Sequence, residues 1–227
     1  MQLIELISSI KNSVVAIGIL QPPTDRVNII GSGFFVKSDG LILSAAHLFK
    51  NLGTDVISHL AAMVAEKEEG ALTRYKWLPL EIVARNDAED AALLKIQSPH
   101  DTLLKPLKLG VTTEIKEGQE IFFTGFPYAA NLMNEGFGVT LITNKGIISS
   151  VKRKATPPQP IDWFIIDAIS NPGNSGCPLI DIISNTVIGI MSISFRTGSK
   201  VQPSLDIREP MHIAGAKPID YAKALLD

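Results

Sequence analysis

The chain has little of several features that mark whole classes of protein. It holds one cysteine in 227 residues, which excludes an intrachain disulfide and favours a reducing compartment. Its net charge of −2 gives no basic field for nucleic acid, and we interpret the basic run Lys152–Lys154 as a solvated loop. No apolar run reaches the ~18 residues of a membrane span, and the first residues lack the pattern of a secretory signal. We therefore expect a cytoplasmic protein that binds neither nucleic acid nor a membrane.

Histidine is also scarce, with four in the chain. The four are scattered, and none stands at metal-ligand spacing from the one cysteine, Cys177. We expect neither a metal site nor a cofactor.

Turn-forming residues, in contrast, are plentiful. The chain has 17 glycines and 14 prolines, and 45% of its residues are hydrophobic. Short apolar segments between the turns predict an all-β barrel architecture in one two-lobed domain. The predicted strands are Val14–Leu20, Gly33–Val36, Leu41–Ser44, Leu80–Ala84, Ala92–Ile96, Glu120–Gly125, Thr140–Ser149, Trp163–Asp167, Pro178–Ile182 and Val187–Ile193.

Helices are expected in few places. Apolar residues spaced along residues 3–14 predict a short amphipathic helix that leads into the first strand. A terminal helix is expected over Ile219–Leu226. Within residues 51–75, the apolar positions 56, 57, 60 and 64 suggest one face of a further helix, and strands are the alternative for this segment.

The most informative stretch is Asn171–Leu179, with the sequence NPGNSGCPL. A serine hydroxyl is a poor nucleophile at neutral pH, so it needs a base for its proton and N–H groups to hold the oxyanion that forms. Glycines on both sides of Ser175 let the chain bend tightly, expose the hydroxyl and aim the N–H groups of residues 173 and 175 at one point. The stretch is a candidate active-site loop, which requires a histidine and a carboxylate elsewhere in the chain.

His47 is the histidine best placed to serve as that base. It closes the segment GSGFFVKSDGLILSAAH, which predicts a strand, a Ser-Asp-Gly turn and a second strand. His47 therefore falls just past a strand end, where rigid framework holds it beside a cleft. His59 lies in a segment of ambiguous pattern, and His100 follows Ser98-Pro99 in an exposed connection.

Asp87 and Asp90 are the candidate carboxylates. Asp90 directly precedes an apolar strand and can be buried at its start, whereas we interpret Asp87 and Glu89 as turn or surface residues. A buried aspartate that accepts the imidazole N–H fixes the tautomer and stabilises the imidazolium. The order histidine, aspartate, serine is that of chymotrypsin-like proteases, while α/β-hydrolases place the serine first.

At these residues the chain resembles the trypsin-like serine proteases, and among them the HtrA/Deg protease domain. The blocks that carry the resemblance are GSGFFVKSDGLILSAAH, DAALLKI, DAISNPGNSGCPLID, VIGIMSISF and, more weakly, AGAKPID. The resemblance implies two six-stranded antiparallel β-barrels of the chymotrypsin type with short terminal helices, forming one peptidase domain over residues 1–227. The N-terminal barrel is expected over about residues 1–98, the inter-barrel connection over 99–116, and the C-terminal barrel with its helix over 117–227. The PDZ module common in HtrA proteins is expected to be absent.

The resemblance also implies roles for individual residues. Ser175 would be the nucleophile, His47 the general base and then the general acid, and Asp90 the residue that orients the imidazole. Gly173 and Ser175 would supply the oxyanion-hole N–H groups. The implied activity is that of a serine endopeptidase acting on peptides or proteins through an acyl-enzyme intermediate.

Two residues of the loop depart from related patterns. Cys177 stands where the family usually has glycine, and a cysteine there can crowd the loop, although it is small and tolerates burial. Asn174 replaces the aspartate of digestive trypsins, so the zymogen salt bridge cannot form and proteolytic activation is not expected.

By the same resemblance, Ile169 and Ser170 would form the floor of the primary specificity pocket. Ile193 and Ser194 would lie along a wall. Because no acidic residue stands at the floor, we expect cleavage after small or medium apolar residues rather than after Lys or Arg. No segment of the sequence indicates an oligomeric state.

Two other functions remain open. One is an inactive trypsin-like module that binds peptides in the same cleft. The other is an esterase-like hydrolase built on Ser175, Asp206 and His212, which follow the α/β-hydrolase order. Residue 177 is not the glycine of a Gly-x-Ser-x-Gly elbow, and no alternating strand–helix pattern surrounds it, so the sequence disfavours the esterase.

Overall fold

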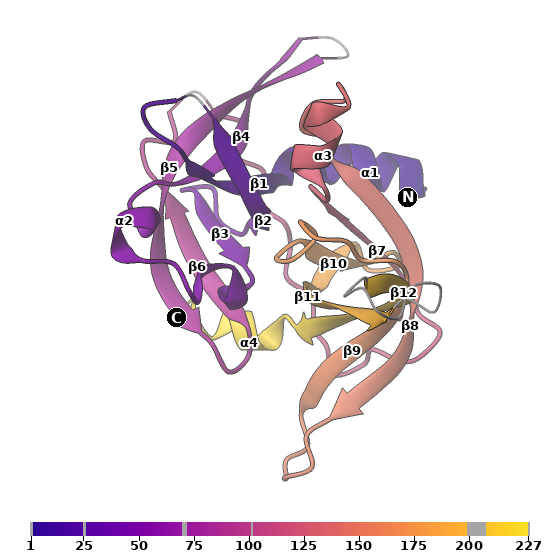
Figure 1. Ribbon diagram of the computed structural model, residues 1–227. Coiled ribbons are helices and arrows are strands. Elements are labelled where there is room, and N and C mark those ends of the chain that lie inside the picture. The colour runs from indigo at the N-terminus through magenta and orange to yellow at the C-terminus, as the bar shows by residue number, and fades with distance from the viewer. Residues whose placement is uncertain (1, 25, 70–71, 101, 199–207, 227) are drawn as a thin grey trace.

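The computed structural model describes residues 2–24, 26–69, 72–100, 102–198 and 208–226 (Figure 1). The chain forms two closed six-stranded antiparallel β-barrels that lie side by side, with a few short helices around them. The predicted all-β architecture of two such barrels with short terminal helices is confirmed.

The N-terminal barrel closes in the strand order β1-β2-β3-β6-β5-β4. The predicted hairpin around Ser38-Asp39-Gly40 is confirmed, because Gly33 pairs with Ser44 across the two strands. Gly40 has a φ of +94°, a conformation that glycine adopts without steric cost. The strands are β1 (Val14–Leu20), β2 (Val27–Phe35), β3 (Leu41–Ser44), β4 (Leu60–Glu69), β5 (Leu72–Asn86) and β6 (Ala91–Ile96).

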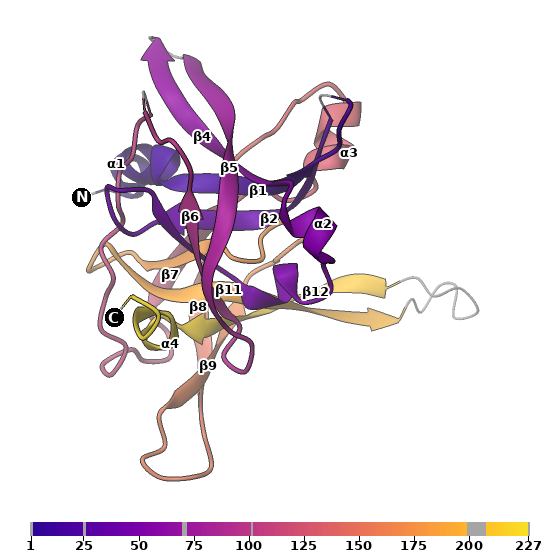
Figure 2. The ribbon, with the colours of Figure 1, turned by 90° about the vertical axis from the view of Figure 1, so that its left-hand side faces the viewer.

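The C-terminal barrel closes in the order β10-β11-β12-β9-β8-β7. Two of its hairpins, β8–β9 and β11–β12, extend beyond the barrel body (Figure 2). The strands are β7 (Glu120–Gly125), β8 (Ile142–Arg153), β9 (Ile161–Asp167), β10 (Pro178–Asp181), β11 (Thr186–Gly198) and β12 (Arg208–Pro218).

The helices are all short. In the part of the chain that the structure describes, no helix has both the length and the apolar content of a membrane span. The α-helices are α1 (Leu3–Ile10), α2 (Thr54–Ile57), α3 (Ala129–Asn134) and α4 (Asp220–Lys223), and the 3₁₀ helices are η1 (Lys11–Ser13) and η2 (Ala46–Phe49).

The connection between the barrels is fastened to both of them. The N–H of Leu107 donates to the carbonyl of Phe35 in the N-terminal barrel at 2.8 Å. Three residues later, the N–H of Gly110 donates to the carbonyl of Val187 in the C-terminal barrel, also at 2.8 Å. The connection therefore fixes the spacing of the barrels as well as joining them.

Apolar side chains fill each barrel and also the layer between the barrels. Successive residues of a strand point to opposite faces, so Val15 of β1 lies inside its barrel while Val14 lies in the layer between the two. In the same way, Phe34 and Phe122 belong to that layer, each next in sequence to a phenylalanine of its own barrel's core. A strand buried on both faces reads as a continuous apolar run, which explains the sequence VVAIGIL.

Several elements differ from the predictions. The helix suggested within residues 51–75 is wrong except for α2, because Leu60–Ala65 are all buried in β4 and show no alternation. The terminal helix is shorter than predicted, and β12 and α3 were not predicted. The run at residues 152–154 is not a solvated loop, because β8 extends to Arg153 and Lys154 forms an ion pair.

Cys177 fits the fold because its side chain enters the C-terminal barrel. It is fully buried in the apolar core there, so it does not enter the cleft. Residue 125 leaves the necessary space, because a Cβ on Gly125 would lie 3.0 Å from the Cβ of Cys177. Burial raises the pKa of the Cys177 thiol well above its usual range, so the reactive thiolate is suppressed.

We expect Cys177 to resist alkylation in the folded protein. Iodoacetamide at pH 8 should leave the native chain unmodified and should label it fully in guanidinium chloride, because alkylation requires an exposed thiolate. Mass spectrometry of the two samples measures the difference. Equal labelling rates in the two samples would contradict the placement of Cys177 in the core.

Candidate active site

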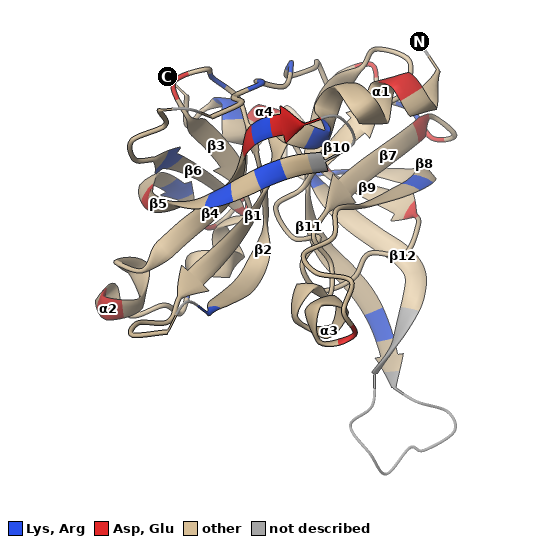
Figure 3. Cartoon of the chain, turned by 90° about the horizontal axis from the view of Figure 1, so that it is seen from above, with Lys and Arg blue, Asp and Glu red and all other residues tan. Residues whose placement is uncertain are grey.

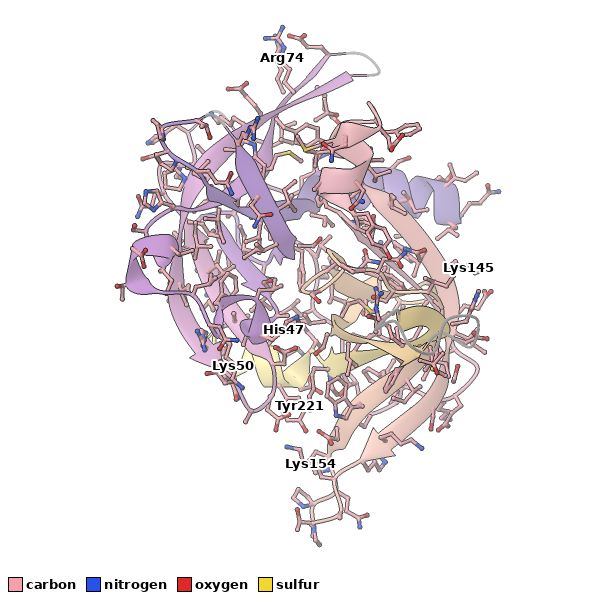
Figure 4. The ribbon with its side chains drawn as sticks, viewed as in Figure 1. His47, Lys50, Arg74, Lys145, Lys154 and Tyr221 are labelled. Carbon is pink, nitrogen blue, oxygen red and sulfur yellow. The ribbon has the colours of Figure 1, made fainter. Side chains whose placement is uncertain are left out.

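His47 lies where the N-terminal barrel meets the C-terminal barrel (Figure 4). Strand β3 ends at Ser44, and the buried Ala45 and Ala46 lead into η2, which carries His47. The backbone is therefore anchored in the barrel, while the imidazole keeps 42% of its surface exposed. The predicted position just past a strand end is confirmed.

Asp90 holds the imidazole from the turn between β5 and β6. Its Oδ2 lies 2.8 Å from Nδ1 of His47, and its Oδ1 accepts the backbone N–H of His47 at 2.7 Å. Asp90 has a φ of +50°, a left-handed conformation that aspartate tolerates better than most residues. Because both carboxylate oxygens bind His47, the carboxylate fixes the imidazole ring and the backbone beneath it.

Ser192 completes the surroundings of Asp90, and sequence reasoning missed it. Its hydroxyl donates to Oδ2 of Asp90 from β11, in the other barrel. No local pattern marks Ser192, which sits in the block VIGIMSISF among alternating apolar residues. Only the pairing of β11 within the second barrel brings this hydroxyl to Asp90.

The pKa of Asp90 is lower than usual. Burial by itself raises the pKa, but hydrogen bonds from His47 and Ser192, together with the charge of a protonated imidazole, outweigh it. Asp90 is therefore a carboxylate at neutral pH and accepts the proton on Nδ1 of His47. That leaves Nε2 as the acceptor for the Ser175 hydroxyl, whose Oγ lies 3.0 Å away.

The loop before Ser175 forms a turn with glycine at its third position. The N–H of Asn174 donates to the carbonyl of Asn171 at 2.9 Å, Pro172 occupies the second position, and Gly173 has a φ of +102°. These features are those of a type II turn. The carbonyl of Pro172 accepts the N–H of Tyr128 at 2.9 Å, so the trans peptide directs the Gly173 N–H to the side opposite Tyr128.

On either side of Asn174, the N–H groups of Gly173 and Ser175 have no acceptor within the described residues. The neighbouring N–H groups are satisfied: that of Gly176 donates to Met191 at 2.8 Å, and that of Cys177 donates to Asn174 at 3.1 Å. The loop therefore offers two free donors beside the Ser175 hydroxyl, which is the arrangement needed to bind an oxyanion.

Ser32 of β2 ties this loop to the other barrel. Its hydroxyl donates to the carbonyl of Gly173 at 2.7 Å and accepts the N–H of Phe126 at 3.0 Å. Its backbone N–H donates to the carbonyl of Ser175 at 2.9 Å. Through Ser32, strand β2 of the N-terminal barrel therefore fixes both Gly173 and Ser175, the neighbours of Asn174, in the C-terminal barrel.

The close approach of β2 to the Ser175 loop also requires a glycine at position 176. A Cβ on Gly176 would lie 2.1 Å from the carbonyl oxygen of Ser32 and 2.3 Å from Oγ of Ser44. Gly176 also has a φ of +87°. The sequence indicated that the glycines allow a tight bend, and the structure adds that Gly176 lets the two barrels approach each other.

The predicted specificity residues lie on two segments beside Ser175. Ile169 and Ser170 precede the turn in the loop after β9, and Ser170 is almost fully buried. Ile193 and Ser194 follow Ser192 on β11, and Ile193 is exposed.

Among the described residues, no other histidine forms a hydrogen bond with Ser175. His59 binds the carbonyl of Asp55 next to α2, and His212 lies exposed on β12. His47 is the histidine within hydrogen-bond distance of Ser175. Asp206, the acid of the esterase alternative, lies outside the described residues.

A hydrogen-bonded serine, histidine and aspartate at the junction of two antiparallel β-barrels define a trypsin-like peptidase domain. The family described as "Trypsin-like peptidase domain" matches residues 31–190, and the chain belongs to this family. Its relatives are HtrA and Deg proteases. One of them, "Probable periplasmic serine endoprotease DegP-like" from Halomonas elongata, is 29% identical over 87% of this chain and 34% of its own length. "Serine protease HTRA4" from Mus musculus is 33% identical over 79% of this chain and 33% of its own length.

Among solved structures, the "Crystal structure of Deg5" matches with a TM-score of 0.70. It is 24% identical, and the match covers 97% of this chain and 90% of that one, so it shows a shared fold. The chain spans about a third of the length of the curated relatives.

We expect Gly173→Ala to slow the reaction of Ser175 with a fluorophosphonate by roughly 100- to 1000-fold, the effect of removing one oxyanion donor. A Cβ there would lie 2.3 Å from the carbonyl oxygen of Phe126, so the turn must shift and move its N–H. Gly118→Ala is the matched control, since Gly118 has a φ of +85° but open space around its Cα. Both variants incur backbone strain, so equal rate losses at equal thermal midpoints would contradict a specific role for Gly173.

Proposed function

We propose that this chain is a serine endopeptidase that hydrolyses peptide bonds through an acyl-enzyme intermediate. The observation that carries the proposal is the continuous path from Asp90 through both nitrogens of His47 to Oγ of Ser175, with distances of 2.8 and 3.0 Å. Distances of this length are those of a nucleophile poised beside its base. The names of the relatives, which include "serine endoprotease" and "serine protease", support the same class of reaction.

The reaction follows from these positions. Ser175 Oγ attacks the scissile carbonyl carbon while Nε2 of His47 takes the hydroxyl proton. The carbonyl oxygen becomes an oxyanion, which the N–H groups of Gly173 and Ser175 stabilise. His47 then gives the proton to the leaving amine as the C–N bond breaks, and the acyl group remains on Ser175 as an ester. Water attacks that ester with His47 again as base, releasing the carboxylic acid and restoring the serine.

Asp90 contributes to these reaction steps through His47. Its carboxylate keeps the proton on Nδ1, so that Nε2 can accept, and it stabilises the imidazolium that forms in each half-reaction. The Ser192 hydroxyl holds the same carboxylate oxygen from the second barrel.

An extended peptide can bind along β11. Up to Met191 this strand contacts the segment that follows Ser175, since the N–H of Met191 donates to the carbonyl of Cys177 at 3.0 Å. From Ser192 onward, within the described residues, β11 pairs with β12 on one edge only. An open edge next to the nucleophile suits addition of a substrate strand, with backbone hydrogen bonds giving affinity for any sequence.

A groove of about 550 Å³ can receive the other side of the substrate. The β1–β2 hairpin, Trp77 of β5 and helix α3 line it. Both walls lead to the reaction site, because β2 continues to Ser32 and α3 follows Tyr128, and both of these residues bind the Ser175 loop. Apolar side chains form much of the lining, and Arg26 is the one charged residue among the described residues that line it, so we propose that residues on the leaving-group side are apolar or acidic.

We propose that the primary specificity pocket uses Ile169 and Ser170 at its floor and Ile193 and Ser194 along a wall. None of these side chains carries a charge, so small or medium apolar residues should precede the cleaved bond. A proteome-derived peptide library, incubated with the protein and read by mass spectrometry, should show cleavage mainly after Ala, Val and Leu. The Ser175→Ala protein is the control for contaminating proteases, and cleavage mainly after Lys or Arg would contradict this assignment.

We expect a fluorophosphonate probe to label the wild-type protein and to label neither Ser175→Ala nor His47→Ala. The probe bonds to an activated serine, and at neutral pH activation requires the base. In-gel fluorescence, with circular dichroism as the check on folding, measures this. Folded wild-type protein that fails to label would instead support the alternative, an inactive module that binds peptides in the same cleft.

We propose peptide or protein substrates and a cytoplasmic site of action. The single buried cysteine and the low net charge are compatible with that site. In the view of Figure 3, the described Lys, Arg, Asp and Glu residues are interspersed on both barrels, which does not suggest a basic face for nucleic acid. The word "periplasmic" in the name of one relative describes that protein, and fractionation of the native host would decide between the two compartments.

A further inference from the structure

Glu89, the residue before Asp90, lies in a turn, as the sequence analysis allowed, but most of its carboxylate side chain is shielded from solvent. Its side chain is 13% exposed. Its Oε2 lies 3.2 Å from Nζ of Lys217, and its Oε1 pairs with Nζ of Lys154. Both lysines belong to the C-terminal barrel side of the interface, whereas Glu89 sits in the β5–β6 turn of the N-terminal barrel.

Lys217 is held firmly by its own barrel. It lies on β12 with 7% of its side chain exposed, and its Nζ is 2.8 Å from Oδ1 of Asp162 on β9. The same Nζ lies 4.1 Å above the ring of Trp163 and 5.7 Å from the ring of Tyr221. Burying an ammonium group without partners costs much free energy, so the Lys217 side chain is held where it contacts Asp162 and Trp163. In that position, Glu89 is its second carboxylate partner.

Two consecutive residues of the turn therefore bind neighbouring strands of the other barrel. Glu89 binds Lys217 of β12, and Asp90 accepts a hydrogen bond from Ser192 of β11. Met191 of β11 pairs with Ala216 of β12, and Ser192 and Lys217 each directly follow one of these two residues. The turn is thus fixed at two points, one of them the carboxylate that holds His47.

The backbone conformation of Asp90 needs such support from surrounding contacts. Its left-handed conformation costs about 1–2 kcal/mol for a residue with a Cβ, so it persists only where surrounding contacts determine it. A buried ion pair is weak as a source of stability, because desolvation offsets most of its attraction. The Glu89–Lys217 ion pair can instead define the position of the β5–β6 turn relative to the C-terminal barrel.

We propose that the Glu89–Lys217 ion pair is a positioning device: it fixes the β5–β6 turn against the C-terminal barrel so that Asp90 reaches His47 and Ser192 together. Glu89 and Lys217 act on the reaction through Asp90 and do not touch the substrate. The inference rests on the proposed function, since the position of Asp90 matters only if His47 serves Ser175. Figure 4 shows His47 at the barrel junction, with Tyr221 and Lys154 below it in that view.

The test compares Lys217→Met, which removes the charge but keeps a long apolar side chain, with Lys217→Arg, which keeps the charge. Lys217→Met should lower kcat by roughly 10- to 100-fold with KM little changed, because a misplaced group costs rate more than binding. Lys217→Arg should restore most of the activity. Glu89→Gln should resemble Lys217→Met, and the double variant should be no worse than either single variant, since the two residues act as one unit.

Lys145→Met is the matched control. Lys145 is also a strand lysine of the C-terminal barrel in an ion pair, with Glu120 at 2.5 Å, but both side chains are about half exposed. This variant should have wild-type kinetics. A rate loss in Lys145→Met equal to that in Lys217→Met would show a general effect of lost charge and would overturn the proposal.

A second readout does not depend on turnover. In Ser175→Ala protein, NMR titration of His47 should move to lower pH when Lys217 is changed to Met, because a displaced Asp90 stabilises the imidazolium less. The charged and titratable groups that face this region are Asp90, His47, Glu89, Lys154, Asp162, Lys217 and Tyr221. Only histidine, among these types, ordinarily titrates between pH 5 and 8.

The outcomes separate the two proposals. No probe labelling of wild-type protein together with a shifted His47 titration in the Lys217→Met protein would contradict the peptidase and leave the positioning role standing. Normal labelling with an unchanged titration and unchanged kcat in Lys217→Met would overturn the positioning role alone. If Lys217→Met does not fold, Glu89→Gln, which keeps its shape and hydrogen-bonding oxygen, decides by the same two measurements.

Discussion

Strand β2 and the Ser175 loop meet across the barrel interface, and the geometry of the site depends on that meeting. Ser32 binds the carbonyls of Gly173 and Ser175, so it fixes the turn whose N–H groups are free and the residue that carries the hydroxyl. Gly176 permits the approach because it has no Cβ. His47 and Asp90 come from one barrel, and Ser175 from the other. The site is therefore a property of docked barrels, and neither barrel holds it alone.

At the interface, apolar contacts hold the two barrels together and polar contacts set their alignment. Phe34, Phe122 and Phe126 are almost fully buried in the layer between the barrels and supply non-directional attraction. Such a layer alone sets no unique register, because an apolar surface can slide by a fraction of an ångström at little cost. Hydrogen bonds and ion pairs depend strongly on distance and angle, so the few polar contacts at Ser32 and Glu89 define the alignment. The hydrogen bonds that join Asp90, His47 and Ser175 need that precision.

The sequence singled out the three residues that the structure brings within hydrogen-bond distance, because each has a local signal. Ser175 lies between glycines, His47 follows a hairpin with a recognisable turn, and Asp90 immediately precedes an apolar strand. These signals are short-range, and the closed barrels that bring them together follow from the family resemblance. The strand between residues 60 and 69 was missed because both of its faces are buried over its first half, which removes the alternation that identifies a strand.

The supporting residues could not be predicted, for a different physical reason. Ser32 and Ser192 are serines in strands, and nothing around them in the chain distinguishes them from solvent-facing residues. Glu89 looked like a turn residue because its partner Lys217 is 128 residues away. The contacts of Ser32 and Glu89 form only when the barrels dock, so no window of sequence contains them. The specificity residues Ile169 and Ser170 remain predictions, since side chains on several segments decide the shape of a pocket.

The split of the site between two barrels has a consequence for synthesis. His47 is made 128 residues before Ser175 and Asp90 85 residues before it, and β12, which closes the second barrel, ends only at Pro218. At roughly 5–20 residues per second, several seconds pass between translation of the first and last groups of the triad. Throughout that interval the emerging chain contains a histidine and a carboxylate but no activated serine. The proposed peptidase activity therefore cannot act on the nascent chain, or on its neighbours on the same message, before the whole domain has folded.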